Sequence, residues 1–230
     1  MRPCWQAALP DMKKHILEIS NLCFSWPGAT EYLLKNLDLQ LEPGEHIGIR
    51  GANGSGKTTL FRCITGLETI QSGSITLESD LIKTEKDFRS LRKRVGFCLQ
   101  NAEDQLIFPT VSEDVSFGPL NLGLNQEEVE ERVGKTLEKL GMAGYASRNS
   151  YELSGGEQKM IALASVLAMQ PEVLLLDEPL NALDTDVSAR IIRLFADMDC
   201  AIIAVSHEYE FMSRVCGKIF ELHNGQLFLT

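Results

Sequence analysis

Alternating apolar and polar residues mark the first strands of this 230-residue chain. The segment 37–41 reads Leu-Asp-Leu-Gln-Leu, a strict alternation that predicts a half-buried strand, and 16–19 and 46–49 are further strand-like runs. Residues 42–45, Glu-Pro-Gly-Glu, predict a turn between the last two strands. The pattern therefore predicts an N-terminal β region, which we expect to be antiparallel.

Continuous apolar runs at 173–176 and 201–205 have a different character. Parallel strands that are covered on both faces read as uninterrupted apolar segments, so both runs are predicted to be central parallel strands. The segments 74–77 and 95–99 are further predicted strands, separated by the polar and charged stretch 78–94. The chain is therefore predicted to have an α/β fold.

Helical periodicity appears in the middle of the chain. Residues 125–128, Asn-Gln-Glu-Glu, form a capping-box pattern ahead of apolar residues at helical spacing. These apolar residues are Val129, Val133, Leu137 and Leu140. We interpret the segment from about 101 to 168 as a helical subdomain inserted between strands.

The two ends of the chain are predicted to differ. The segments 218–223 and 226–229 flank Asn224-Gly225, a pair that favours a type I′ turn, and so predict a closing hairpin. Residues 1–11 look detached from the first strand, and we expect them to be an unstructured leader to a single domain over residues 12–230.

Composition restricts the possible functions. Acidic residues outnumber basic ones by 32 to 22, and because nonspecific nucleic-acid binding depends on clustered Lys and Arg, no nucleic-acid partner is expected. The six cysteines are scattered without a C-x-x-C pair, which is typical of reduced thiols in a cytosolic protein. No apolar run is long enough to cross a bilayer, so we expect any membrane role to be peripheral.

A glycine-rich motif follows the strand 46–49. The residues that we expect to contact a nucleotide here are Gly51, Ala52, Asn53, Gly54, Ser55, Gly56, Lys57, Thr58 and Thr59. Such a loop points backbone N–H groups at phosphate oxygens, and the helix behind it directs its positive end to the same place. The motif predicts a nucleoside triphosphate site, with Lys57 on the β/γ-phosphates and Thr58 on Mg²⁺. A P-loop alone is compatible with kinases, GTPases and motor proteins.

A second motif, Leu-Ser-Gly-Gly-Glu-Gln at 153–158, precedes the apolar helical segment 160–169. Ser154 and Glu157 form a capping box, which many unrelated helices share. Taken alone, this motif would therefore indicate no more than the start of a helix. The class of protein is indicated by the order of this and the other motifs along the chain.

Two adjacent carboxylates, Asp177 and Glu178, follow the apolar strand 173–176, and Leu183-Asp184 and Ser206-His207 come next. The ordered set of motifs resembles the ATP-binding cassette (ABC) ATPase family over residues 16–230. The resemblance implies a P-loop NTPase core of the ABC type that binds and hydrolyses ATP. A P-loop kinase would leave the Leu-Ser-Gly-Gly-Glu-Gln motif unexplained.

The resemblance implies a role for each residue at the nucleotide. Asp177 holds Mg²⁺ indirectly or through water, near Thr58, and Glu178 acts as the general base on the attacking water. Gln100 matches the Q-loop, whose amide reaches Mg²⁺ and water. His207 matches the switch histidine that contacts the γ-phosphate. The catalytic residues are therefore expected to be Glu178, His207 and Gln100.

The family's second nucleotide contact is made across a dimer. The resemblance implies that the signature residues Ser154, Gly155, Gly156 and Glu157 cover the ATP of a second subunit, with Asp184 at the seam between the two subunits. Trp26 lies where the family places the aromatic residue that stacks on adenine. We therefore expect a homodimer or heterodimer of ABC ATPases that closes head to tail.

Further segments are similar to the CbiO-type ATPases of energy-coupling-factor importers for cobalt and nickel. They are 94–96, 100–106, 114–124 and 166–172, and the Phe-Gly-Pro run at 117–119 is the most distinctive. This resemblance implies a transmembrane T-component that docks near residues 100–108, a separate membrane subunit that binds the substrate, and a location on the cytoplasmic face of the membrane. Leu106, Ile107 and Phe108 are expected to be exposed there. The expected cargo is cobalt or nickel, and a vitamin is the alternative.

Two positions depart from the family pattern. Met160 stands where many members have Arg, and Asn181 stands where a small residue is usual, so the closed dimer is expected to be held less firmly. The alternative function is a soluble ABC ATPase that acts in DNA repair, translation or cluster assembly. The chain has neither the long coiled coil of the repair proteins nor the paired cassettes of the translation proteins, which leaves cluster assembly as the alternative to transport.

Overall fold

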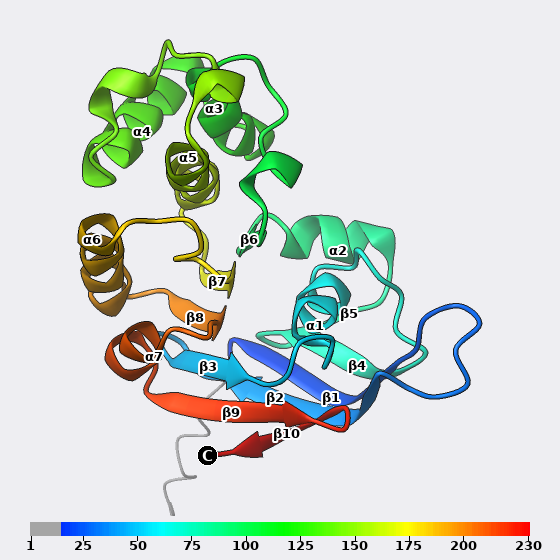
Figure 1. Cartoon of the computed structure of the whole chain (residues 1–230). Helices are drawn as coiled ribbons and strands as arrows, with labels where there is room; N and C mark the ends of the chain where they lie inside the picture. The colour runs from blue at the N-terminus through cyan, green and yellow to red at the C-terminus, as the bar shows by residue number, and fades with distance from the viewer. Residues whose placement is uncertain (1–14) are drawn as a thin grey trace, which may run out of the picture.

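A computed structural model describes residues 15–230 of the chain (Figure 1), so the predicted leader at 1–11 lies outside the described residues. The first of two sheets is antiparallel, with strand order β2-β1-β4-β5. Its strands are β1 (Leu17–Phe24), β2 (Leu34–Leu41), β4 (Ser72–Leu77) and β5 (Asp80–Ile82). The predicted N-terminal antiparallel region is therefore confirmed.

The second sheet has six strands in the order β10-β9-β3-β8-β7-β6. Its strands are β3 (His46–Arg50), β6 (Val95–Cys98), β7 (Val173–Asp177), β8 (Ala201–Val205), β9 (Lys218–His223) and β10 (Gln226–Leu229). All neighbours are parallel except β9 and β10, which form the predicted hairpin. Asn224 and Gly225 both have positive φ, at 50° and 80°, as a type I′ turn requires.

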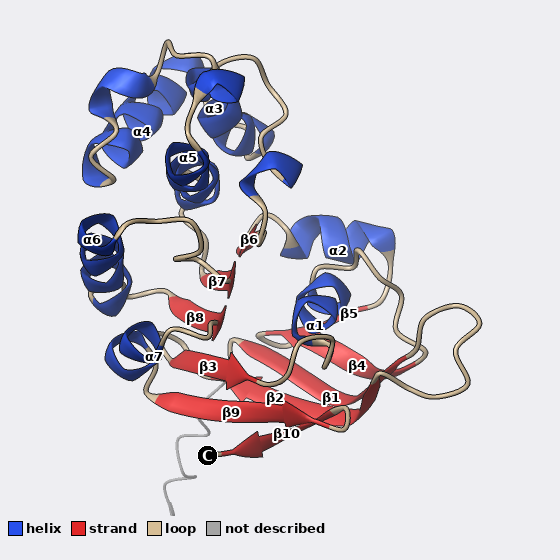
Figure 2. Cartoon of the chain, viewed as in Figure 1, coloured by secondary structure: helices blue, strands red, loops and turns tan. Residues whose placement is uncertain are grey.

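Helices lie on both sides of the second sheet (Figure 2). They are α1 (Lys57–Ile64), α2 (Glu85–Leu91), α3 (Val111–Asn121), α4 (Gln126–Lys139), α5 (Gly155–Leu167), α6 (Thr185–Ala196) and α7 (Tyr209–Val215), with short 3-10 turns at Ala102–Asp104, Ala143–Tyr145 and Ser150–Glu152. Helices α3 and α4 pack against α5 away from this sheet, and the three gather at the end of the molecule opposite β9 and β10. No helix of the described part of the chain is long and apolar enough to cross a membrane.

Strand β7 shows why the centre of the sheet has an unbroken apolar sequence. Leu174 and Leu176 pack in a cluster with residues of α5, α6 and α7, whereas Val173 and Leu175 pack in a second cluster with α1 and the four-stranded sheet. Both faces of the strand are therefore covered, as the run of apolar residues predicts.

Three elements, α2, β5 and α3, were not delimited from the sequence pattern. Helix α2 and strand β5 lie within the stretch 78–94 that was read only as polar, and Leu91 is the one residue of α2 that is buried. Helix α3 begins at a capping box in which the Thr110 hydroxyl accepts a hydrogen bond from the N–H of Glu113. Gly118 and Pro119 near its end conceal its helical pattern.

Candidate functional site

The P-loop connects the end of β3 to the start of α1. Gly51 has φ 152°, and a Cβ atom there would come within 2.6 Å of the Leu222 carbonyl oxygen, so only glycine fits. Gly56, at φ 106°, precedes the first residue of α1, Lys57. The Lys57 ammonium lies inside the loop, where it donates hydrogen bonds to the carbonyls of Gly51 (2.8 Å) and Ala52 (2.9 Å). Burial lowers the pKa of Lys57, and the nearby carboxylates of Glu178 and Asp177 oppose this effect.

Asp177 is the last residue of β7, and its side chain reaches the P-loop. The Thr58 hydroxyl donates a hydrogen bond to Asp177 Oδ2 at 2.6 Å, which joins two motifs that are 119 positions apart in the chain. Asp177 is only 1% exposed, and this burial raises its pKa, while the Thr58 hydrogen bond and the charges of Lys159 and Lys57 act in the opposite direction. The parallel neighbours β7 and β8 bring this carboxylate to the sheet edge where the P-loop begins.

Glu178 takes a different direction from Asp177. Its φ of 46° is in the left-handed region, and its backbone N–H donates to the Val205 carbonyl at 2.9 Å. Glu178 Oε2 accepts a hydrogen bond from the His207 backbone N–H at 3.3 Å, and the His207 Nε2 atom lies 3.3 Å from Oε1. Oε1 is buried and receives no hydrogen bond from the described residues, and burial raises the pKa of Glu178. The two adjacent carboxylates therefore point in different directions: that of Asp177 lies next to Thr58, and that of Glu178 lies next to His207.

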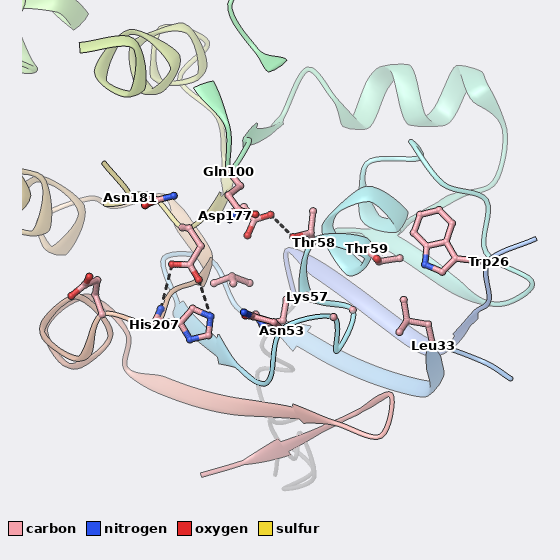
Figure 3. Close-up of a pocket in the computed structure, with 15 residues that line it drawn as sticks. Trp26, Leu33, Asn53, Lys57, Thr58, Thr59, Gln100, Asp177, Asn181 and His207 are labelled. Atoms are coloured by element: carbon pink, nitrogen blue, oxygen red, sulfur yellow. Dashed lines mark hydrogen bonds and ion pairs between the residues drawn. The ribbon is translucent and has the colours of Figure 1, made fainter. Parts of the chain in front are cut away.

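These groups line one cavity of about 730 Å³ (Figure 3). Trp26 and Leu33 lie at one end, and His207 and Asn181 lie at the other, with Lys57 between them. The cavity is lined by Trp26, Leu33, Asn53, Gly54, Gly56, Lys57, Thr58, Thr59, Gln100, Asp177, Glu178, Asn181, Val205, His207 and Glu208. Trp26 is 42% exposed, and its ring is perpendicular to that of Phe24, with the ring centroids 5.0 Å apart.

The signature motif forms the start of α5 as its capping box predicts. The Ser154 hydroxyl accepts from the Glu157 N–H at 3.3 Å, and Glu157 Oε2 accepts from the Ser154 N–H at 2.8 Å. The Tyr145 hydroxyl donates to Glu157 Oε1 at 2.7 Å. This bond, aided by those of Ser154 and by the charge of Arg148, lowers the pKa of Glu157 to about 2. Glu157 is thus held by its own chain, and nothing in the sequence pattern pointed to Tyr145 as its partner.

Ser154, Gly155 and Gly156 do not line the cavity that contains the P-loop. Gly155 instead lines a neighbouring hollow of about 370 Å³, which shares Gln100 and Asn181 with that cavity. Asp184 caps α6, where its Oδ1 accepts from the Val187 N–H at 2.8 Å.

One expectation about exposure needs correction. Leu106 was expected to be exposed with its neighbours, but it is 5% exposed and packs in the helical core, whereas Ile107 is 59% exposed. Met160 is 3% exposed and packs in the same core, so its side chain is not free to contact a partner subunit. Both residues are apolar, and only the packing of α3 and α5 distinguishes an interior position from a surface one.

Several residues of the site were not identified from the sequence. Leu33, Val205 and Glu208 line the cavity without belonging to any motif. Lys159 is 2% exposed and donates to backbone carbonyls beside the cavity. Their positions depend on strand pairing between distant segments. No group of three or more His, Cys, Asp and Glu side chains is placed to hold a metal ion among residues 15–230.

The fold and the site define a P-loop nucleoside triphosphatase with a cassette-type signature at the start of α5. The chain belongs to the ABC transporter family, whose profile matches residues 34–181. It is therefore an ABC ATPase, which binds ATP and couples its hydrolysis to transport.

Three relatives refine this placement. The chain is 41% identical over 216 residues to the energy-coupling factor transporter ATP-binding protein EcfA of Methanothermobacter thermautotrophicus, covering 92% of this chain and 69% of the relative. CbiO1 from Clostridium perfringens, part of the ABC transporter complex cbiONQ, superposes with a TM-score of 0.82 at 32% identity over 94% of this chain and 88% of that one. The dimeric bacterial ABC transporter cassette MJ0796 gives 0.84 at 25% identity, over 92% and 96%. Within its family the chain is thus similar to the energy-coupling-factor ATPases.

Proposed function

We propose that this chain is the ATP-hydrolysing subunit of an energy-coupling-factor importer for cobalt or nickel ions. The observation that carries the catalytic part is the single cavity where Lys57, Thr58, Asp177, Glu178 and His207 converge. The likeness to EcfA and to cbiO1 supports the transport part. Within residues 12–230, we propose that about 101–168 act as a helical subdomain against the nucleotide-binding core.

The proposed ATP position follows the length of the cavity. The adenine stacks on the Trp26 indole, which lines the cavity, and the phosphates lie on the P-loop, where Lys57 supplies a positive charge. Thr58 and Asp177 provide hydroxyl and carboxylate oxygens, the ligand types that Mg²⁺ prefers, and Gln100 provides an amide oxygen at the same end. Bound Mg²⁺ would neutralise charge on the phosphate oxygens.

Glu178 is the proposed general base. Its buried Oε1 has a free lone pair and accepts a proton from the attacking water, while the His207 N–H holds Oε2 in place. The raised pKa brings this carboxylate nearer to the pH of the cell, which makes it a stronger base than an ordinary glutamate. The proposed role of His207 is to contact the γ-phosphate from the other side of this carboxylate.

Two copies of the site complete each other in the proposed assembly. Because Ser154, Gly155 and Gly156 lie outside the P-loop cavity of their own chain, we propose that they cover the nucleotide of a partner subunit, with Asp184 near the seam. The dimeric arrangement of the related cassette MJ0796 supports this proposal.

The proposed docking surface for the transmembrane component is formed by residues that follow Gln100 in the chain. Ile107, Phe117 and Leu120 are 59%, 47% and 49% exposed, and the rings of Phe108 and Phe117 are 5.2 Å apart. Exposed apolar side chains of this kind suit a helix of a partner. The subunit would then lie on the cytoplasmic face of the membrane, where a separate membrane subunit binds the metal ion as cargo.

The test is uptake by reconstituted vesicles that contain the membrane subunits and this chain. Ile107→Asp is expected to keep its ATPase activity in solution but to abolish both co-purification with the membrane subunits and uptake of radiolabelled cobalt or nickel. Leu229→Asp, at a site 66% exposed on β10, is the matched control and is expected to transport normally. Normal uptake by Ile107→Asp would refute the docking surface. If the unmodified chain captured no membrane subunit, the transport proposal itself would be wrong.

A further inference from the structure

Lys159 is a buried lysine with no role in the proposed nucleotide binding, hydrolysis or docking. It lies in the second turn of α5 and is 2% exposed. Its ammonium donates to the carbonyls of Leu99 and Gln100, both at 2.9 Å, and approaches the Asp177 carbonyl at 3.5 Å. Lysine has three donors and no acceptor, so these carbonyls account for its full donor capacity.

The three carbonyls come from two neighbouring strand ends. Leu99 and Gln100 follow β6, Asp177 ends β7, and the two strands pair in parallel through Cys98 and Leu176. Backbone carbonyls beyond the end of a ladder need other partners when they are buried. Lys159 supplies that partner from α5, and it therefore joins the signature helix to the chain segments that carry Gln100 and Asp177.

A second set of contacts ties the same segment to the same helix. Gln105 Nε2 donates to the Ala162 carbonyl at 2.6 Å and to the Ser165 hydroxyl at 2.9 Å, and Gln105 Oε1 accepts from the Leu99 N–H at 3.0 Å. Gln105 thus anchors the far end of the segment 99–105, and Lys159 anchors the end next to the cavity. The position of Gln100 is therefore set by α5 as well as by β6.

Placing a buried ammonium at this position costs free energy. Burying a charge is unfavourable unless polar partners compensate, and an apolar residue would fill this interior space without that penalty. Lys159 also lies close enough to Asp177 for its charge to oppose the effect of burial on that carboxylate. The geometry thus favours a role in the site over a role in packing alone.

We propose that Lys159 is a positioning residue for ATP hydrolysis, which fixes the signature helix α5 against the backbone of Gln100 and Asp177. Movement of α5 would then shift the amide and the carboxylate together. The proposal rests on the roles proposed above for Gln100 and Asp177. It adds a residue that does not line the P-loop cavity but determines where those two side chains lie.

The test compares Lys159→Met with the unmodified chain in steady-state ATP hydrolysis at a series of Mg²⁺ concentrations. Because small displacements of catalytic groups slow turnover strongly, kcat is expected to fall by roughly tenfold to a hundredfold. The Mg²⁺ concentration for half-maximal rate is expected to rise several-fold, while the KM for ATP stays nearly constant because the P-loop is untouched. Lys159→Gln, which keeps an N–H donor, is expected to have a kcat and a Mg²⁺ requirement between those of the unmodified chain and Lys159→Met. It tests the proposal if Lys159→Met does not fold.

Leu163→Ala is the matched structural control, since Leu163 is 1% exposed on the same helix. It is expected to lower Tm without changing the Mg²⁺ requirement. Lys159→Met with an unchanged kcat and Mg²⁺ requirement, or with losses no larger than those of Leu163→Ala at an equal loss of Tm, would overturn the proposal.

Gln100→Ala and Asp177→Asn separate this inference from the proposed function. If both leave turnover and the Mg²⁺ requirement unchanged, the roles assigned to Gln100 and Asp177 are wrong, and the positioning role falls with them. If both impair turnover and Lys159→Met does not, only the positioning role is wrong. Combining Lys159→Met with Gln100→Ala is expected to slow kcat by less than the product of the single effects, because the two changes act on one contact network. Independent effects would contradict the shared network.

Discussion

Replacement of Glu178 by Gln tests the centre of the proposed chemistry. The change keeps the shape of the side chain but removes the proton-accepting carboxylate. Because general-base catalysis contributes about 10²- to 10⁴-fold, kcat is expected to fall by that factor, which is a rise in the activation barrier of about 3 to 5 kcal/mol at 1.36 kcal/mol per decade. Steady-state phosphate release measures this fall.

The structure also predicts what Glu178→Gln leaves intact. Burial raises the pKa of Glu178, which means that its charged form is held at a penalty, so a neutral amide is not expected to lower Tm. ATP binding should persist because the P-loop and Lys57 are unchanged. With hydrolysis blocked, sedimentation in ATP is expected to detect an accumulated dimer.

Glu208→Gln is the matched control, because Glu208 lines the same cavity and the change is chemically identical. Its kcat is expected to remain within about twofold of the parent, a difference of less than 1 kcal/mol. Hydrolysis by Glu178→Gln at the parent rate would refute the general-base assignment. An equal loss in both variants would show that the overall charge of the cavity, and not one proton acceptor, controls the rate.

Individual contacts give three further predictions. Lys57→Ala is expected to weaken ATP binding by roughly tenfold to a hundredfold, since a hydrogen bond to a charged group contributes about 1.5 to 3 kcal/mol, and equal affinity by titration would contradict it. Met160→Arg is expected to lower the free energy of unfolding by about 3 kcal/mol or more by burying an unpaired charge, whereas Met160→Leu should change it by less than about 1.5 kcal/mol in denaturant titrations. Tyr145→Phe is expected to raise the pKa of Glu157 from about 2 towards its ordinary value of 4.5, and an unchanged pKa by NMR would disprove the contact. Because the folded-state pKa is depressed, the stability gained from Tyr145 should be present above pH 4.5 and be lost as the pH falls towards 2.

The local sequence pattern was sufficient to predict strands, turns and helix starts where burial, turn geometry or capping restricts the residue types at those positions. The alternation at 37–41 predicted β2, and the apolar runs predicted β7 and β8, because burial on one or both faces leaves a direct mark on the sequence. Asn224-Gly225 predicted its turn because the turn needs two residues with positive φ. Capping boxes predicted the starts of α4 and α5 for the same kind of reason.

Motif order along the chain determined the class of protein and most of the candidate site. The P-loop, the signature and the Asp177–Glu178 pair are each short enough to be read without a structure, since their chemistry depends on neighbours within a few positions. Surface elements such as α2 were not predictable in this way, because an exposed helix buries too few residues to leave a periodic pattern.

Only the tertiary structure decided which side chains meet. The Thr58–Asp177 hydrogen bond and the three carbonyls around Lys159 join groups that are far apart in the chain. The pairing of parallel strands and the packing of helices on the sheet bring these groups together. The exposed Ile107 and the buried Leu106 are adjacent and similarly apolar, yet they lie on opposite sides of a packed surface. The sequence by itself thus determined the family and the set of candidate functional residues, because both depend on residue type and order. The distances between these residues, their burial and their pKa values came from long-range packing that no local pattern encodes.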